Sequence, residues 1–261
     1  MRSTDMADEL FGMAGGALPS GVRLATAKRG GVTVTRVEIA REGLARPRGR
    51  YVTLEMPSVS VLDERDADVI ETCAAELRAL LPPEGPVLVL GVGSHRITAD
   101  ALGPRTAQKV LVTMGPQHAL PVKGIRPVAA IAPGVSASTG LTLRQLAGAL
   151  VAAVRPAALI CVDSLCSAEG ARLGRSMQFS DTGLYPAQAD HAKHLDAAAL
   201  GVPVIAAGIP TLMDSDEGAD LVVTPRALDS VIAHGSALLA GTINRALQPR
   251  LSVAQLCWLA G

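Results

Sequence analysis

Hydrophobic and polar positions follow two different patterns along the chain, and the change falls near residue 87. Before it, residues 32–39 and 50–56 alternate between apolar and polar side chains, as strands with one buried face do. After it, short runs are continuously apolar, which is typical of strands covered on both faces. These runs are residues 87–91, 128–131, 158–162, 203–207 and 220–223.

Helical periodicity occupies most of the remaining segments, namely residues 63–81, 101–111, 140–154, 191–199 and 227–247. Buried strands that alternate with helices predict an α/β fold, in which three α/β/α layers are built around a mainly parallel sheet. We expect a single domain over residues 31–261, with 31–62 as extra strands or a small lobe. Residues 1–30 are weakly patterned and predict a flexible or loosely docked arm.

The charge balance narrows the possible partners. The 24 basic and 24 acidic side chains cancel, whereas binding to nucleic acid or to a membrane surface rests on an excess of lysine and arginine. Four cysteines without a CxxC pair indicate a reducing compartment, and no signal-peptide pattern is present. The most apolar stretch, 146–166, is interrupted by Arg155, Pro156 and Asp163. We therefore expect a cytoplasmic protein without a membrane or nucleic-acid partner.

Two acidic residues stand out because they follow apolar strands. Asp163 comes directly after the run 158–162, and Asp100 follows the run 87–91 across a turn that contains Gly91 and Gly93. In parallel sheets the reactive groups gather at the carboxyl ends of the strands, where an isolated carboxylate carries a desolvation cost. Each acid alone could cap the helix that follows it, but two such acids in one sheet favour a function.

Two facing carboxylates could do either of two jobs. They could share a proton, so that one stays neutral while the other activates water, or they could hold a divalent cation. The residues themselves leave both alternatives open. The turn from Gly91 to Ser94 is a candidate source of backbone donors for a developing oxyanion.

The remaining motifs point to less specific chemistry. Gly91 and Gly93 lack the third glycine of a dinucleotide fingerprint, since position 96 is arginine, so we expect no cofactor. Residues 180–183 are interpreted as a polar turn or as a substrate-contacting loop. His191 and His194 could supply a metal ligand, although a solvated helix face is the commoner use of such residues. Neither HExxH nor GxSxG occurs, so we expect neither a zincin, nor a dedicated metal site, nor a serine hydrolase.

An ordered series of segments resembles the germination protease family, the spore endopeptidases that degrade small acid-soluble spore proteins. The segments are residues 51–55, 91–93, 98–104, 126–134, 139–140, 162–165, 180–183 with Pro186, and 200–211. That family is similar in turn to the nickel-hydrogenase maturation endopeptidases, which share a three-layer core. The resemblance covers nearly the whole chain.

The resemblance implies an aspartate-dependent endopeptidase that forms no covalent intermediate. Asp100 stands where the maturation enzymes carry a metal-contacting Glu, Asp163 matches their second acid, and the corresponding aspartates are the proposed catalytic pair of the spore enzymes. Positions expected to bind substrate or support the site are Glu55, Gly93, Ser94, Asp181 and Thr182. The resemblance also implies small acid-soluble spore proteins as substrates, a homotetramer, and a location in the spore core or forespore.

Two other functions stay open at this point, a metal-recognising maturation-type peptidase and a catalytically silent relative that only binds protein. The chain also departs from the family pattern. Ser94 replaces the usual Asn, and residues 187–192 replace a glycine-rich stretch. Residues 2–9 resemble the segment that follows the family's propeptide, so we expect this chain to lack the usual propeptide.

Overall fold

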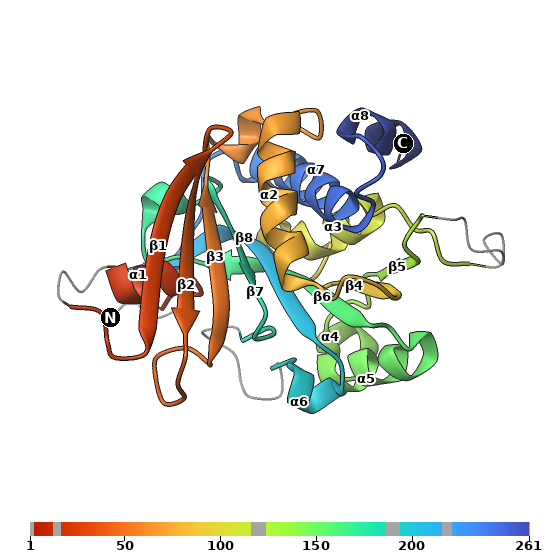
Figure 1. Cartoon of the computed structure of the whole chain (residues 1–261), viewed down its shortest axis with the longest axis horizontal. Helices are drawn as coiled ribbons and strands as arrows, with labels where there is room; N and C mark the ends of the chain where they lie inside the picture. The colour runs from red at the N-terminus through yellow and green to blue at the C-terminus, as the bar shows by residue number, and fades with distance from the viewer. Residues whose placement is uncertain (1–2, 13–16, 116–123, 186–193, 216–220, 261) are drawn as a thin grey trace.

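One mixed sheet runs through the computed structural model, which describes residues 3–12, 17–115, 124–185, 194–215 and 221–260. Within these ranges the sheet has nine strands in the order β1-β2-β3-β7-β8-β6-β4-β5, with β9 paired to β8 (Figure 1). The strands are β1 (Val22–Arg29), β2 (Val32–Ile39), β3 (Gly49–Glu55), β4 (Val87–Gly91), β5 (Val128–Ile131), β6 (Ala158–Cys166), β7 (Ser176–Ser180), β8 (Val204–Asp214) and β9 (Val222–Val223).

The expectation of a mainly parallel sheet is only half right. Strands β5, β4, β6 and β8 are parallel neighbours, as the continuous apolar runs predict. Strands β1, β2, β3 and β7 pair antiparallel, and β7 joins this group to β8. The residues 31–62 therefore extend the central sheet. Apolar and polar residues alternate along β2, as they do in antiparallel strands that have one buried face and one exposed face.

Helices cover both faces of the sheet, which confirms the α/β fold (Figure 1). One apolar cluster joins α2, α3 and α7 to Val89, Ile160 and Ile205. A second cluster joins α5 to Leu88, Leu159 and other residues that point from the opposite face. The helices are α1 (Ala7–Gly12), α2 (Ala67–Leu80), α3 (Leu102–Lys109), α4 (Ser136–Thr139), α5 (Leu143–Val154), α6 (Ala197–Leu200), α7 (Leu228–Leu247) and α8 (Val253–Ala260), with short 3-10 helices η1 (Val59–Val61), η2 (Thr98–Asp100) and η4 (Gly170–Arg172).

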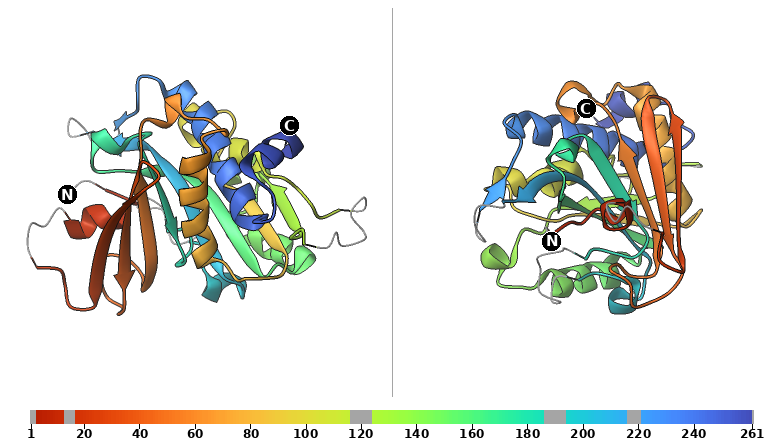
Figure 2. Two further views of the ribbon diagram at one scale, coloured as in Figure 1. Left: turned by 45° about the horizontal axis from the view of Figure 1, so that its top comes forward. Right: turned by 90° about the vertical axis from the view of Figure 1, so that its left-hand side faces the viewer.

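The expected flexible arm over residues 1–30 is wrong for the part that the structure describes. Residues 22–29 form the edge strand β1, and α1 lies against β2 and β3 (Figure 2). Met6 and Ala7 are fully buried. Seven of the eight β1 side chains are exposed, so the strand is held by backbone pairing and shows no apolar alternation along its sequence.

Several element boundaries also differ from the expected ones. Strand β6 continues beyond residue 162 to Cys166, and β8 continues beyond residue 207 to Asp214, so polar residues lie inside paired strands. The helix expected over 191–199 is confined to α6 at Ala197–Leu200, and residues 191–193 lie outside the described ranges. No helix in the part described has the length and apolar character to cross a membrane.

Candidate active site

Asp163 lies within strand β6, on the face of the sheet that α5 covers. It is half-buried, pairs with Gly208 of β8, and accepts a hydrogen bond at Oδ1 from the Ser164 amide at 2.8 Å. Because β6 runs on to Cys166, no helix follows Asp163 directly. The helix-capping interpretation of Asp163 is therefore wrong, and the residue enters the site from inside a rigid strand.

Asp100 is the last residue of η2, a 3-10 turn between β4 and α3. The side chain is half-buried, and the backbone carbonyl accepts a hydrogen bond from the Ser94 amide at 3.1 Å. Helix α3 begins at Leu102 with Ala101 as its N-cap and no side-chain cap. The N-cap position of this helix is therefore held by Ala101 and not by Asp100.

Backbone contacts hold the segments that carry the two aspartates at the same end of the parallel strands. The Val92 amide, just beyond β4, donates to the Val162 carbonyl at 2.8 Å. Residues of η2 lie within 8 Å of residues of β6, measured between Cα atoms. Thr211 of β8 donates from Oγ1 to the Ala99 carbonyl at 3.0 Å. The carboxyl ends of β4 and β6 and the middle of β8 therefore converge around this corner.

Two glycines make room for the aspartates. Gly93 has a φ of 115°, and a Cβ there would lie 2.1 Å from the Asp100 carbonyl oxygen and 2.9 Å from its Oδ1. Gly208 allows an equally close approach, since a Cβ on it would lie 2.3 Å from the Asp163 carbonyl oxygen. Gly93 therefore packs directly against Asp100, as a supporting residue would.

A small pocket opens beside Asp163. Its volume is about 30 Å³, which is room for one or two water molecules. Asp163 and Ser164 line it, and the buried Ser164 hydroxyl has no hydrogen-bond partner among the described residues. The volume of the pocket offers a place for a water molecule or a polar group of a substrate.

The other residues expected at the site separate into two groups. Thr182 lines the pocket and donates from Oγ1 to the Ser180 hydroxyl at 3.3 Å. Asp181, next to it, points to Arg50 instead and accepts hydrogen bonds from the backbone N and the Nε of Arg50, both at 2.7 Å.

The amides of Val92 and Ser94 are already bonded to backbone carbonyls. Those two amides of the 91–94 turn are thus not free oxyanion donors.

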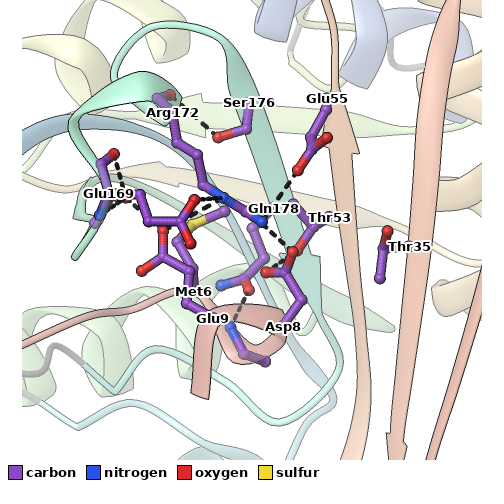
Figure 3. A network of polar contacts seen from close by, with 12 residues as sticks. Met6, Asp8, Glu9, Thr35, Thr53, Glu55, Glu169, Arg172, Ser176 and Gln178 are labelled. Atoms are coloured by element: carbon purple, nitrogen blue, oxygen red, sulfur yellow. Dashed lines mark hydrogen bonds and ion pairs between the residues drawn. The ribbon is translucent and has the colours of Figure 1, made fainter. Parts of the chain in front are cut away.

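Glu55 lies apart from the pocket, at the end of β3 opposite to Tyr51. The two are four positions apart in the sequence, or about 13 Å along a strand. Figure 3 shows Glu55 beside Arg172, which it contacts at 3.1 Å. Arg172 also contacts Asp8 at 2.6 Å, Glu169 at 3.0 Å and Glu9 at 3.6 Å. Burial lowers the pKa of Arg172, but these carboxylates, Asp8 above all, raise it further than burial lowers it.

Residues of the N-terminal segment and the 40–48 loop form walls of the pocket that the sequence did not predict. Asp5, Arg46, Tyr51 and Tyr185 line it together with Asp163. Burial raises the pKa of Tyr51 to about 12. Burial, with the nearby Asp214 and Asp5, raises the pKa of the Cys166 thiol to about 12. Cys166 is therefore protonated at neutral pH and is a poor nucleophile.

The histidines hypothesised as metal ligands are only partly described. His191 lies outside the described ranges, as does the whole of the altered loop 187–192, and His194 packs against the Tyr185 ring with centroids 4.6 Å apart. Among the residues that can be placed, no three His, Cys, Asp or Glu side chains are grouped in a way that could hold a metal ion.

Comparisons with known proteins identify related sequences over most of the chain. The sequence model of one family, described as germination protease, matches residues 17–217. The germination protease of Clostridium perfringens is 32% identical over 84% of this chain and 86% of its own length. That of Priestia megaterium is 33% identical over 78% of this chain and 58% of its own length. Among solved structures, the NiFe hydrogenase maturation protease HycI from Thermococcus kodakarensis is 18% identical with a TM-score of 0.41, covering 64% of this chain and 98% of that one.

Proposed function

We propose, because this chain belongs to the germination protease family, that it cleaves small acid-soluble spore proteins with Asp100 and Asp163 as its catalytic pair. Membership of the family makes the chain a peptidase of spore germination. The substrate, the aspartate pair, a homotetrameric state and a location in the spore core are our proposals. The oligomeric state can be measured by sedimentation of the purified chain.

The proposed reaction is direct hydrolysis of a peptide bond by water. One aspartate, ionised, takes a proton from water as the water oxygen attacks the carbonyl carbon. The other, protonated, donates to the carbonyl oxygen to give a gem-diol. As the C–N bond breaks, the first aspartate passes the proton that it took from water to the leaving amine, and a diol hydroxyl returns a proton to the second aspartate, so that both regain their starting states. Two carboxylates in one site favour this division, since repulsion raises the pKa of one of them.

The observation that carries the proposal is the surroundings of Asp163. Asp163 lies on a buried strand and lines a pocket large enough for one or two waters. The Asp100 segment is held against the same strand ends by its own backbone contacts. A water molecule in this pocket would lie next to the proposed base.

The direct test is cleavage of a small acid-soluble spore protein by Asp163→Asn and Asp100→Asn variants. Each amide keeps the size of the side chain but can neither accept nor release the catalytic proton. We expect kcat to fall by about 10²–10⁴-fold in each variant. Asp68→Asn is the matched control, because Asp68 lies exposed in the first turn of α2, and this variant should cleave at the wild-type rate.

Two results would overturn the proposal. The first is full activity in a folded Asp163→Asn variant, as judged by an unchanged thermal unfolding midpoint. The second is cleavage that stops in a chelator and returns with a divalent cation, because a bound cation would then activate the water. A wild-type chain that cleaves none of these proteins would support the silent relative.

A further inference from the structure

Arg46 joins three segments of the chain that are distant in sequence. It lies between β2 and β3, and only 10% of its side chain is exposed. Nη1 donates to the Tyr185 carbonyl at 2.9 Å, and Nη2 donates to the Thr4 carbonyl at 2.5 Å. Nη2 also contacts Oδ1 of Asp5 at 3.3 Å. A planar guanidinium can serve several acceptors in fixed directions, which the point charge of a lysine cannot.

Asp5 connects this arginine to the strand that carries Asp163. The Asp5 carboxylate accepts from the Cys166 amide at 2.8 Å, and the Asp5 amide donates to the Cys166 carbonyl at 2.8 Å. Its own carbonyl accepts from Nε2 of Gln178 at 2.8 Å. Cys166 is three residues beyond Asp163 on β6. Asp5 therefore fixes the far end of the strand that carries the proposed catalytic residue.

The segments that Arg46 joins are walls of the pocket beside Asp163. Asp5 and Arg46 line one part of it, and Gly183, Leu184 and Tyr185 line another. The pocket is so small that a shift of one wall by a water radius would change what it holds. The relative position of these walls thus decides whether a water or a substrate group fits beside Asp163.

We infer that Arg46 and Asp5 act together as positioning residues for Asp163. This inference rests on the proposed function, since it assigns to the Arg46–Asp5 pair the task of holding the end of β6 and the 183–185 turn at the spacing that catalysis requires. Neither side chain belongs to the apolar clusters of the sheet. Loss of the pair therefore removes positioning and leaves the core packing in place.

The test uses the full chain with Arg46→Lys, Asp5→Asn and the double variant. Lysine keeps the charge but cannot reach all three acceptors, and the asparagine amide would turn a donor toward Arg46 or Cys166. We expect kcat on a small acid-soluble spore protein to fall about 10–100-fold in each single variant, because a misplacement of about 1 Å costs that much. KM should change far less. The thermal midpoint should change little in Arg46→Lys, which keeps the charge, and should fall in Asp5→Asn, which leaves the buried Arg46 without its counter-charge. The double variant should lose no more than the worse single variant, since paired residues act as a unit.

Arg126→Lys is the matched control. Arg126 also donates to two backbone carbonyls, Gly85 at 2.8 Å and Glu84 at 3.1 Å, but at the amino ends of β4 and β5. This variant should keep kcat even if its stability falls. Wild-type kcat in folded Arg46→Lys, or additive losses in the double variant, would overturn the positioning role while leaving the proposed function intact.

Amide hydrogen exchange separates the failure of this inference from the failure of the proposed function. If the wild type cleaves nothing, the peptidase proposal fails, but the pair can still be judged. Arg46→Lys should speed exchange within residues 162–168 and 183–185 and leave 128–131 unchanged. Identical exchange in the variant and the wild type would overturn the inference without any activity measurement.

Discussion

The parallel strands β4, β6 and β8 and the antiparallel strands β3 and β7 belong to one sheet but bury different chemistry. Between the parallel strands and α5 lie Leu88, Leu159 and Cys161, an apolar layer. On the same side of β3 and β7 the buried positions are polar, and the N-terminal segment covers them. These positions are Thr53, Ser176, Gln178 and Ser180.

The two regions therefore obtain their stability from different sources. An apolar layer gains stability from area removed from water and tolerates small displacements. A polar layer is stable only when each buried group finds a partner. Residues 4–9 supply two of these partners, since Asp8 accepts from Thr53 and the Ala7 amide donates to Gln178. Ser176 and Ser180 donate instead to the carbonyls of Arg172 and Gly183. The parallel half thus provides a rigid strand for Asp163, and the antiparallel half fixes the wall that faces it.

The largest expected effect is on stability in the antiparallel half. Arg172→Met leaves the buried carboxylates of Asp8 and Glu9 without their counter-charge, which costs about 3–5 kcal/mol of unfolding free energy. Urea unfolding measures the loss. Arg23→Met is the control, because its contact with Glu38 is 3.9 Å long and mostly exposed, and it should unfold like the wild type. Equal midpoints for the two variants would show that charge pairing does not hold the N-terminal segment.

A smaller loss of stability, with a clear loss of activity, is expected in the parallel half. Gly208→Ala brings a Cβ within 2.3 Å of the Asp163 carbonyl, and this overpacking costs about 1–3 kcal/mol. It should also lower kcat by displacing Asp163. Gly148→Ala in α5 meets no atom within 4 Å and should stabilise the helix by about 0.5–1 kcal/mol without changing kcat. An active Gly208→Ala variant would mean that the site tolerates movement of β6.

The smallest effect at neutral pH is expected for Tyr51, which lies on β3 of the antiparallel half and lines the pocket beside Asp163. Tyr51→Phe loses the hydrogen bond to the Pro47 carbonyl, a cost of about 1 kcal/mol. Burial raises the pKa of Tyr51 from 10.0 to about 12, so the folded chain retains this proton after the unfolded chain has lost it. Its contribution to stability is complete below pH 10 and is lost as the pH rises toward 12. Over this range the wild type should therefore lose up to about 2.7 kcal/mol of stability relative to the variant, so its advantage of about 1 kcal/mol at neutral pH reverses in sign.

Urea unfolding at pH 8 and at pH 11 tests this sign directly, and ultraviolet absorbance reports tyrosinate formation. The chain has only two tyrosines, Tyr51 and Tyr185, and burial raises the pKa of both. The native protein should show little tyrosinate near pH 10. A full tyrosinate signal at that pH, with the fold intact, would mean that the Tyr51 wall of the pocket is open to solvent.

The sequence predicts the parallel half of the fold far better than the antiparallel half. Apolar runs such as 87–91 carry their own signal because both faces of the strand are covered. Strand β1 has no such signal, since its side chains are exposed and only its backbone is paired. Strand β7 alternates Met177 and Phe179 with polar residues, but its polar face is buried as well. A polar residue on a strand usually predicts a face that is exposed to solvent. Here the N-terminal segment covers that face.

The residues of the candidate site also differ in how well the sequence predicts them. Asp163, Asp100 and Gly93 can be selected from the sequence because each adjoins an apolar strand. Asp5 and Arg46 cannot, because they meet across 41 residues and reach the pocket only through the folded sheet. Glu55 matches the family pattern, but its ion-pair partner is Arg172. Arg172 also pairs with Asp8 of α1, so Glu55 is connected to the N-terminal segment and lies apart from the pocket.

The long reach of residues 4–9 has a consequence for how the chain is made. Asp5 pairs with Cys166 across 161 residues, and Ala7 with Gln178 across 171. The ribosome therefore delivers this segment well before Cys166 and Gln178 exist, and loop closure over such a span is slow. The contacts of Asp5 with Cys166 and of Ala7 with Gln178 are therefore expected to form after those between strands that are neighbours in sequence.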